Sequence, residues 1–174
     1  MKKLFYFLLI SLISFSFITC GNDDEDNKEW KKANEAAYDA ITENPDYTEL
    51  KTESGPSGVY YKVLPNDKEK GTEYPLQTSK VKVLYKGMYY DGSIFDAGTG
   101  TSETPAEFLT GGTVRGFSFA LQNMVVGDKW EIWIPWHLGY GSVGYIDPYT
   151  RKTVIKGYTT LVFEVELVEI IQYP

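Results

Sequence analysis

The segment at residues 161–167 has the clearest periodicity in the chain. Apolar side chains occupy every second position: Leu161, Phe163, Val165 and Leu167. Glu164 and Glu166 lie between them. Because successive side chains of a strand point to opposite faces, this period of two predicts a strand with one buried face. A sheet that is apolar on one face and charged on the other is typical of antiparallel arrangements.

Other segments predict the partners of this strand. Strand-like runs cover residues 59–64, 81–90, 129–134 and 160–170. Val81, Val83 and Tyr85 alternate in the same way with other positions, three of which are Lys80, Lys82 and Lys86. Residues 116–124 are the best candidate for a short helix, because four apolar residues would share one face: Phe117, Ala120, Leu121 and Met124. The expected fold class is α+β, an antiparallel sheet with a short α-helix laid on it.

The first residues have the pattern of an export signal. Two lysines precede an apolar run at residues 4–18, which is shorter than the roughly 20 residues of a membrane-spanning helix. We therefore predict that residues 1–19 are a signal peptide. Cys20 is the only cysteine, and residues 17–20 resemble a lipobox, so we expect lipidation at Cys20. The alternative is an ordinary signal peptide with an incidental cysteine.

Residues 20–57 are expected to form an acidic tether and a short N-terminal helix. The acidic run at residues 23–26 resembles the tract after the lipidated cysteine of surface-exported lipoproteins of Bacteroidetes. Residues 20–28 are predicted to be a linker, and residues 29–43 a helix with Trp30 and Ile41 on its apolar stripe. The expected location is the outer membrane, with the protein facing the periplasm or the cell surface.

Charge and composition exclude several functions. Without Lys2 and Lys3, 15 basic residues stand against 24 acidic ones, a net charge of −9 that would repel nucleic acid. The chain has one histidine, His137, and no metal-ligand spacing, so we expect no metal and no cofactor.

The chain is rich in aromatic residues, with 14 Tyr, 9 Phe and 4 Trp. Many of these would have to line a pocket.

Four motifs in order resemble the FKBP family and cover residues 58–172. The first is V-x-V-x-Y-x-G at residues 81–87, followed by Asp91-Gly92 and Phe95-Asp96. The second begins at Val114-Arg115-Gly116-Phe117 and continues to Gly127. Ile134-Pro135 with Tyr140-Gly141, and the strand at residues 161–167, complete the set. The resemblance implies that residues 58–174 form an antiparallel sheet half-wrapped around a short helix, with a pocket between them.

The resemblance also implies an activity, the rotation of Xaa-Pro peptide bonds in proline-containing polypeptides. It assigns four catalytic positions: Asp96, Tyr140, Phe117 and Phe163. It assigns five substrate-binding positions: Tyr85, Phe95, Phe108, Val114 and Ile155. The Tyr140 hydroxyl would donate to a substrate carbonyl. The implied protein is a monomer, and a macrolide is a candidate ligand of the same pocket.

Three departures from the family leave alternatives open. Phe117 stands where the family usually has Trp, Ala106 replaces a usual aromatic, and the loop at residues 142–158 is longer. One alternative is a catalytically weak or inactive binding module for proline-containing peptides. Another is a structural lipoprotein that uses the Trp30 helix as its contact. The isomerase hypothesis predicts that removal of residues 29–43 leaves activity unchanged.

Overall fold

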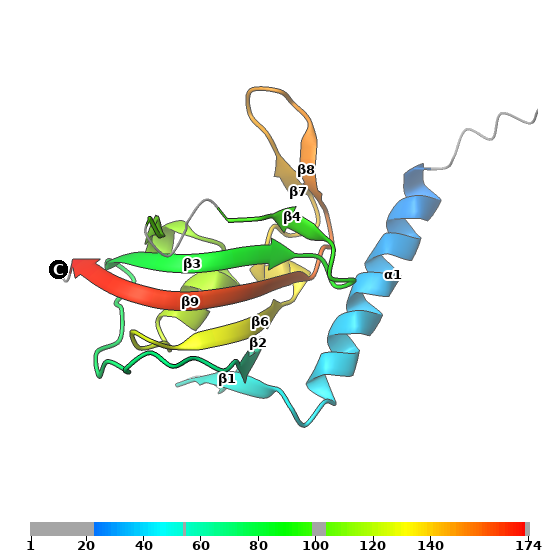
Figure 1. The fold of residues 1–174 in the computed structure, drawn as a ribbon. Helices are drawn as coiled ribbons and strands as arrows, with labels where there is room; N and C mark the ends of the chain where they lie inside the picture. Colours follow the sequence, from blue (N-terminus) through cyan, green and yellow to red (C-terminus); the bar gives the residue numbers. More distant parts are fainter. Residues whose placement is uncertain (1–22, 54, 99–103, 173–174) are drawn as a thin grey trace, which may run out of the picture.

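The computed structural model describes residues 23–53, 55–98 and 104–172. The predicted signal peptide, residues 1–19, and the predicted lipidation site, Cys20, lie outside the described residues. Among those described, no helix is both long and apolar enough to span a membrane. The described residues form a large antiparallel sheet, a small hairpin and two α-helices, so the predicted α+β class is confirmed (Figure 1).

The described part of the chain contributes seven strands to the large sheet. In chain order they are β1 (Thr48–Thr52), β2 (Gly55–Val63), β3 (Lys80–Met88), β4 (Ile94–Asp96), β5 (Ala106–Leu109), β6 (Lys129–Ile134) and β9 (Leu161–Gln172). Six of them are ordered β1-β2-β6-β9-β3-β4, and β5 pairs with β3. All the pairings are antiparallel. The predicted strand at residues 160–170 is therefore β9, in the middle of the sheet.

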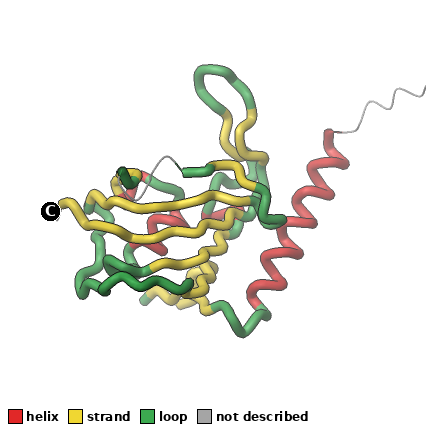
Figure 2. The backbone as a smooth tube through the Cα atoms, in the orientation of Figure 1, coloured by secondary structure: helices red, strands yellow, loops and turns green. Residues whose placement is uncertain are grey.

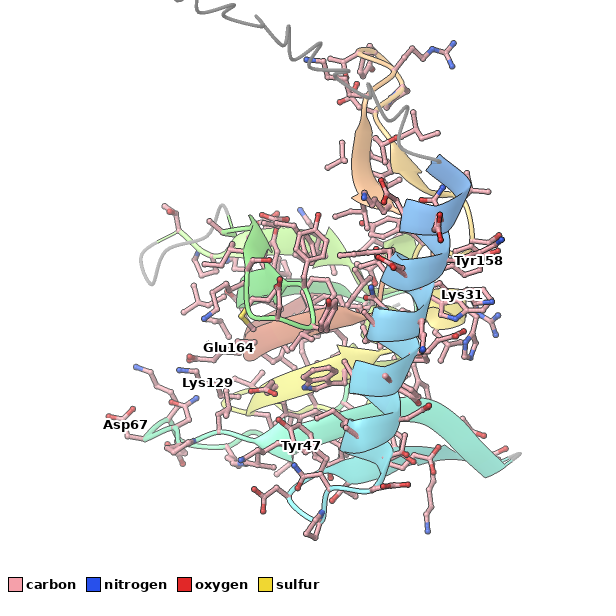
Figure 3. All side chains as sticks on the ribbon, turned by 90° about the vertical axis from the view of Figure 1, so that its right-hand side faces the viewer. Lys31, Tyr47, Asp67, Lys129, Tyr158 and Glu164 are labelled. Atoms are coloured by element: carbon pink, nitrogen blue, oxygen red, sulfur yellow. The ribbon has the colours of Figure 1, made fainter. Side chains whose placement is uncertain are left out.

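The outer face of the sheet is charged, as the period of two predicts. Lys86 on β3 forms an ion pair of 2.9 Å with Glu164 on β9, and Lys82 forms one of 2.7 Å with Glu169. Figure 3 labels Glu164 and Lys129 on this face. The apolar positions at 161, 163, 165 and 167 are all buried. The alternation in the sequence thus separates the core from the solvent.

Helix α2 (Arg115–Leu121) covers the apolar face of the sheet, as Figure 2 shows. It is shorter than the predicted helix at residues 116–124, because the chain turns after Leu121. Phe117, Ala120 and Leu121 are buried in the core together with residues from β3, β6 and β9. Gly116 permits this close packing, since a Cβ atom there would lie 2.3 Å from Cγ2 of Ile134. The helix therefore lies tightly on β6.

Helix α1 (Asp23–Thr42) is longer than predicted. It begins six residues before the predicted start, so residues 23–28, which the sequence analysis assigned to a linker, are helical. The helix passes along one end of the sheet (Figure 1). Its Ile41 is buried in a small cluster with Met88, Trp133 and Val162. Burial of this kind stabilises a helix whose intrinsic propensity alone would be marginal.

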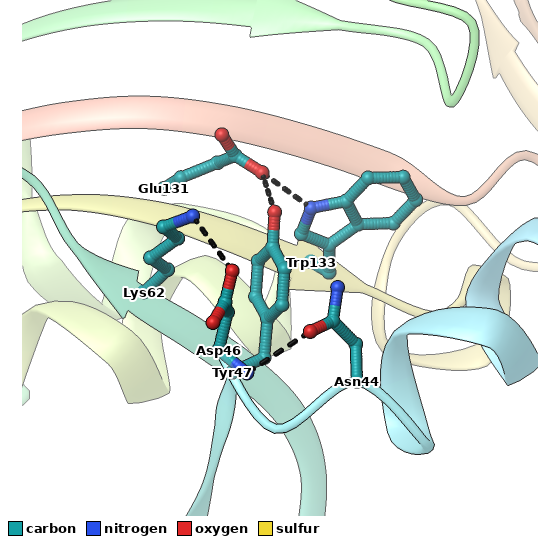
Figure 4. Close-up of polar contacts among 6 residues, drawn as sticks. All are labelled: Asn44, Asp46, Tyr47, Lys62, Glu131 and Trp133. Carbon is teal, nitrogen blue, oxygen red and sulfur yellow. Dashed lines mark hydrogen bonds and ion pairs between the residues drawn. The ribbon is translucent and has the colours of Figure 1, made fainter.

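A polar network fixes the chain where α1 leads into β1, as Figure 4 shows. The Tyr47 hydroxyl donates to Glu131 Oε1 at 2.5 Å, and Trp133 Nε1 donates to the same oxygen at 2.8 Å. Lys62 forms an ion pair with Asp46 at 3.4 Å. Burial and the hydrogen bond to Glu131 raise the pKa of Tyr47 to about 12. Strand β1, which follows this network and pairs with β2, was not predicted from the sequence.

The long loop at residues 142–158 folds into a hairpin. Its strands are β7 (Gly144–Ile146) and β8 (Thr153–Lys156), which pair only with each other. In Figure 1 the hairpin projects away from the large sheet. Two 3₁₀ turns, Thr110–Gly112 and Trp136–Leu138, precede α2 and the hairpin respectively. The hairpin, β4 and α2 together position the site described next.

Candidate active site

A cavity of about 410 Å³ lies between the large sheet and α2. Ten residues line it: Tyr85, Phe95, Asp96, Phe108, Gly112, Thr113, Val114, Phe117, Tyr140 and Phe163. Eight of them are residues that the sequence analysis assigned to the site. They come from four strands, from α2 and its N-cap, and from the turn before the hairpin, so only the folded chain brings them together.

The walls of the cavity are a network of aromatic rings. Phe117 and Phe163 have ring centroids 4.8 Å apart, and Phe163 and Phe95 are 5.8 Å apart. Tyr85 and Phe108 meet edge to face at 5.3 Å. Phe117 is 4% exposed and Phe163 is 8% exposed, so both rings also belong to the core. The floor of the cavity is therefore apolar and held by packing on several sides.

The Asp96 carboxylate is held in place by two hydrogen bonds. The Tyr85 hydroxyl donates to Oδ2 at 2.7 Å, and the Gly98 backbone N–H donates to Oδ1 at 2.9 Å. Gly98 has φ of 75°, and a Cβ atom there would lie 2.1 Å from the Tyr85 carbonyl oxygen. Burial, together with the hydrogen bond to Asp96, raises the pKa of Tyr85 above its usual range. Tyr85 therefore stays protonated and remains a donor.

Tyr140 lines a more exposed edge of the cavity. Its ring lies 5.5 Å from that of Tyr145 on β7, and the residue is 37% exposed. Burial raises the pKa of Tyr140, and the nearby Tyr145 and Asp96 raise it further. Within the described part of the chain, its hydroxyl makes no hydrogen bond. A neutral phenol at a cavity mouth is suited to donate a hydrogen bond to a ligand carbonyl.

The structure does not support one predicted position. Ile155 on β8 is 2% exposed and lies in the core cluster, outside the set of residues that lines the cavity. Its neighbour Val154 is 47% exposed, as expected for adjacent residues of a strand. Ala106, which replaces an aromatic residue usual in the resembled family, is also outside the lining set; it pairs with Val83 and is 9% exposed.

Two lining residues were missed. Gly112 and Thr113 lie between the 3₁₀ turn and α2, beside Val114, the N-cap of α2. Neither residue type suggests an aromatic pocket. The only available signal was their place immediately before the Val114-Arg115-Gly116-Phe117 motif.

The chemistry available in this cavity is limited. Asp96 and the two tyrosines offer polar contacts, and the other side chains offer apolar surface. No described nucleophile–base pair lies in the lining set. The arrangement is suited to enclosing a small apolar group and removing water from it.

The sequence of this chain is similar to those of a known protein family. Residues 71–168 match the sequence profile of the family described as FKBP-type peptidyl-prolyl cis-trans isomerase. The chain is 41% identical over 115 residues to the FKBP-type 22 kDa peptidyl-prolyl cis-trans isomerase of Escherichia coli. That match covers 66% of this chain and 51% of the relative. The macrophage infectivity potentiator of Trypanosoma cruzi is 28% identical over 167 residues, covering 96% of this chain and 78% of the relative.

Solved structures agree with these matches. A crystal structure of a peptidyl-prolyl cis-trans isomerase from Pseudomonas syringae superposes with a TM-score of 0.68 at 30% identity. It covers 84% of this chain and 96% of that one. FkpA from Escherichia coli superposes with a TM-score of 0.66 at 26% identity, covering 87% and 63% respectively. The chain spans about half the length of the Escherichia coli 22 kDa relative. The chain belongs to the family of FKBP-type peptidyl-prolyl cis-trans isomerases.

Proposed function

We propose that this protein is a peptidyl-prolyl cis-trans isomerase that accelerates rotation of Xaa-Pro bonds in exported proteins. The observation that carries the proposal is the apolar aromatic cavity with one fixed carboxylate and one free phenol at its edge. The Escherichia coli and Pseudomonas syringae relatives are themselves described as isomerases. Proline-containing polypeptides are accordingly the substrates.

The proposed mechanism needs no proton transfer and no covalent intermediate. Resonance in the planar peptide bond creates a rotational barrier of roughly 18–20 kcal/mol. Twisting the bond breaks the resonance and makes the C–N unit less polar. The rings of Phe95, Phe117 and Phe163 enclose the proline and exclude water, which favours the twisted state over the planar one.

Polar contacts at the edge would orient the substrate. The Tyr140 hydroxyl donates to a carbonyl of the bound peptide, which holds one side of the rotating bond while the other side turns. Asp96, fixed by Tyr85 and Gly98, adds a second polar contact near Tyr140. A macrolide is an expected ligand of the same cavity.

Exchange NMR on a short Xaa-Pro peptide tests the activity. The full chain, kept in detergent micelles, should accelerate the isomerisation, and a Tyr140→Phe, Asp96→Ala double variant should lose most of that acceleration. The variant must first give the wild-type circular dichroism spectrum. No acceleration by folded wild-type protein would contradict the isomerase proposal and favour a module that binds proline-containing peptides without catalysis.

We also propose an envelope location, with lipidation at Cys20 and an outer-membrane anchor. The supporting observations are the sequence pattern of residues 1–20 and the name of a relative, outer membrane protein MIP of Legionella longbeachae, 33% identical over 115 residues. Metabolic labelling with a fatty acid should label the wild type and not a Cys20→Ser variant. Protease treatment of intact cells then separates a surface-facing protein, which is cut, from a periplasmic one, which is protected. Absence of label in the wild type would contradict the anchor.

A further inference from the structure

Helix α1 lies outside residues 71–168, the segment that matches the family, yet its docking is specific. Asn34 is 0% exposed, and both polar atoms of its side-chain amide form hydrogen bonds. Its Nδ2 donates to the Trp30 carbonyl at 2.9 Å, and its Oδ1 accepts from the Thr160 backbone N–H at 2.8 Å. The Thr160 hydroxyl donates back to the Asn34 carbonyl at 3.2 Å. A sliding or rotating helix would break the two buried bonds between Asn34 and Thr160, so the register of α1 on the domain is fixed.

Asn34 binds the short segment that connects the hairpin to the large sheet. Strand β8 ends at Lys156 and β9 begins at Leu161, so Thr159 and Thr160 lie between them. Trp30 Nε1 donates to the Thr159 hydroxyl at 3.2 Å, and this hydroxyl donates to the Lys156 carbonyl at 2.7 Å. Helix α1 therefore restrains one leg of the hairpin beside the cavity.

The Trp30 ring also supports a wall of the cavity through one intervening residue. It meets the Tyr89 ring edge to face, with centroids 5.7 Å apart. Tyr89 in turn packs against Phe95, with centroids 5.2 Å apart, and Phe95 lines the cavity. The Tyr89 hydroxyl reaches the Val154 carbonyl on β8 at 3.4 Å. Removal of the Trp30 ring would leave space behind Tyr89, toward which Tyr89 and Phe95 could shift.

Lys31, the next residue of α1, supports the turn that carries Tyr140 at the edge of the cavity. The Lys31 ammonium lies 4.7 Å from the centre of the Tyr158 ring, a cation–π contact, and Figure 3 labels both residues on the same side of α1. Tyr158 has φ of 58°, a conformation that is unusual for a bulky side chain and requires support from its surroundings. Its backbone N–H donates to the Gly141 carbonyl at 2.9 Å, next to Tyr140.

We propose that α1 is an integral part of the active site and that Trp30 is a positioning residue. Through Tyr89 it holds Phe95 at the distance from Phe163 that encloses the substrate proline, while Lys31 and Tyr158 hold the turn that carries Tyr140. This differs from the expectation that removal of residues 29–43 leaves activity unchanged. The activity readout rests on the proposed isomerase function.

The test compares two truncations of aromatic residues on the same helix. Trp30→Ala removes the ring behind Tyr89. The matched control, Tyr38→Ala, removes a ring that packs on Tyr60 at 5.9 Å and donates to the Gly58 carbonyl at 2.7 Å, away from the cavity. Both are made in the full chain in micelles. Each variant is assayed for isomerisation of a short Xaa-Pro peptide at a temperature where it is fully folded, and the ring signals of Phe95 and Tyr140 are followed by NMR.

Trp30→Ala is expected to lower kcat/KM about tenfold and to shift the Phe95 signals, because small displacements of the groups that enclose a substrate are costly. Tyr38→Ala should leave both unchanged even if its stability falls as much, and Trp30→Phe should restore most of the activity. Equal losses in the two Ala variants, or unchanged Phe95 signals in Trp30→Ala, would overturn the proposal. If wild-type protein shows no isomerisation, the isomerase function fails, while the Phe95 signals still test the positioning role.

Discussion

Replacement of Ile134 by alanine is expected to lower the free energy of unfolding by about 2–5 kcal/mol. Ile134 is 0% exposed on β6, and its side chain fills the contact with Gly116 at the start of α2. The truncation leaves a cavity between the helix and the sheet, and Gly116 has no side chain with which to fill it. Urea unfolding measures the effect, and an unchanged m-value would show that the unfolded states are comparable.

Ile94→Ala is the matched control for this experiment. Ile94 is also an isoleucine in a strand, but it is 55% exposed on β4. Its truncation should change the free energy of unfolding by no more than about 0.5 kcal/mol. Similar losses in both variants would contradict the prediction that the burial of Ile134 against Gly116 makes its truncation costly.

The packing of α2 on the sheet explains why the main elements of the fold were predictable from the sequence. The strand at residues 161–167 and the helix around Phe117 each have an apolar face of the correct period, and each face needs the other for burial. β9 pairs with both β3 and β6, so one regular strand fixes two neighbours. The predicted strand at residues 129–134 matches β6 at both ends. Periodicity was sufficient for the central strands of the sheet, whereas the short strands β4 and β5 were not predicted.

The hairpin, the position of Ile155 and strand β1 could not be predicted, because they depend on contacts between residues that are distant in the sequence. The hairpin within residues 142–158 is mostly exposed, so its sequence lacks an alternating pattern. Ile155 was placed in the cavity wall because of its position in this loop, whereas the register of β8 turns it into the core and exposes Val154. A shift of one residue would exchange the two, and no local feature of the sequence sets that register. Strand β1 was also missed; its pairing with β2 and the burial of Leu50 hold it in the sheet.

The start of α1 was mislocated for a different reason. The run at residues 23–26 was interpreted as part of an acidic tether. Negative side chains are, however, favourable in the first turn of a helix, where the unpaired backbone N–H groups carry a partial positive charge. That signal could have extended the predicted helix to Asp23, its observed start. Sequence alone did not show that Asn34 would be buried, since its partner Thr160 is 126 positions away.

The largest effect on activity is expected for Phe117→Ala, about a 10²-fold loss in kcat/KM. Phe117 forms the floor of the cavity, 4.8 Å from Phe163 and 6.4 Å from Phe108 by ring centroids. Without the ring the cavity deepens, water enters it, and the proline is no longer held against Phe163. The preference for the twisted, less polar peptide bond weakens as a result. Exchange NMR on the short Xaa-Pro peptide gives the rates, at a low temperature where circular dichroism shows the variant folded.

Two further substitutions separate the exclusion of water from the aromatic character of the floor. Phe117→Leu keeps an apolar side chain of similar reach, so it should retain most of the activity if a dry cavity is what matters. Phe117→Trp introduces the residue usual in the family and should be at least as active as the wild type. If Phe117→Ala stays active while folded, the floor is not part of the catalytic cavity. If Phe117→Leu is as inactive as Phe117→Ala, catalysis depends on the ring itself, because the apolar side chain of Leu would still exclude water.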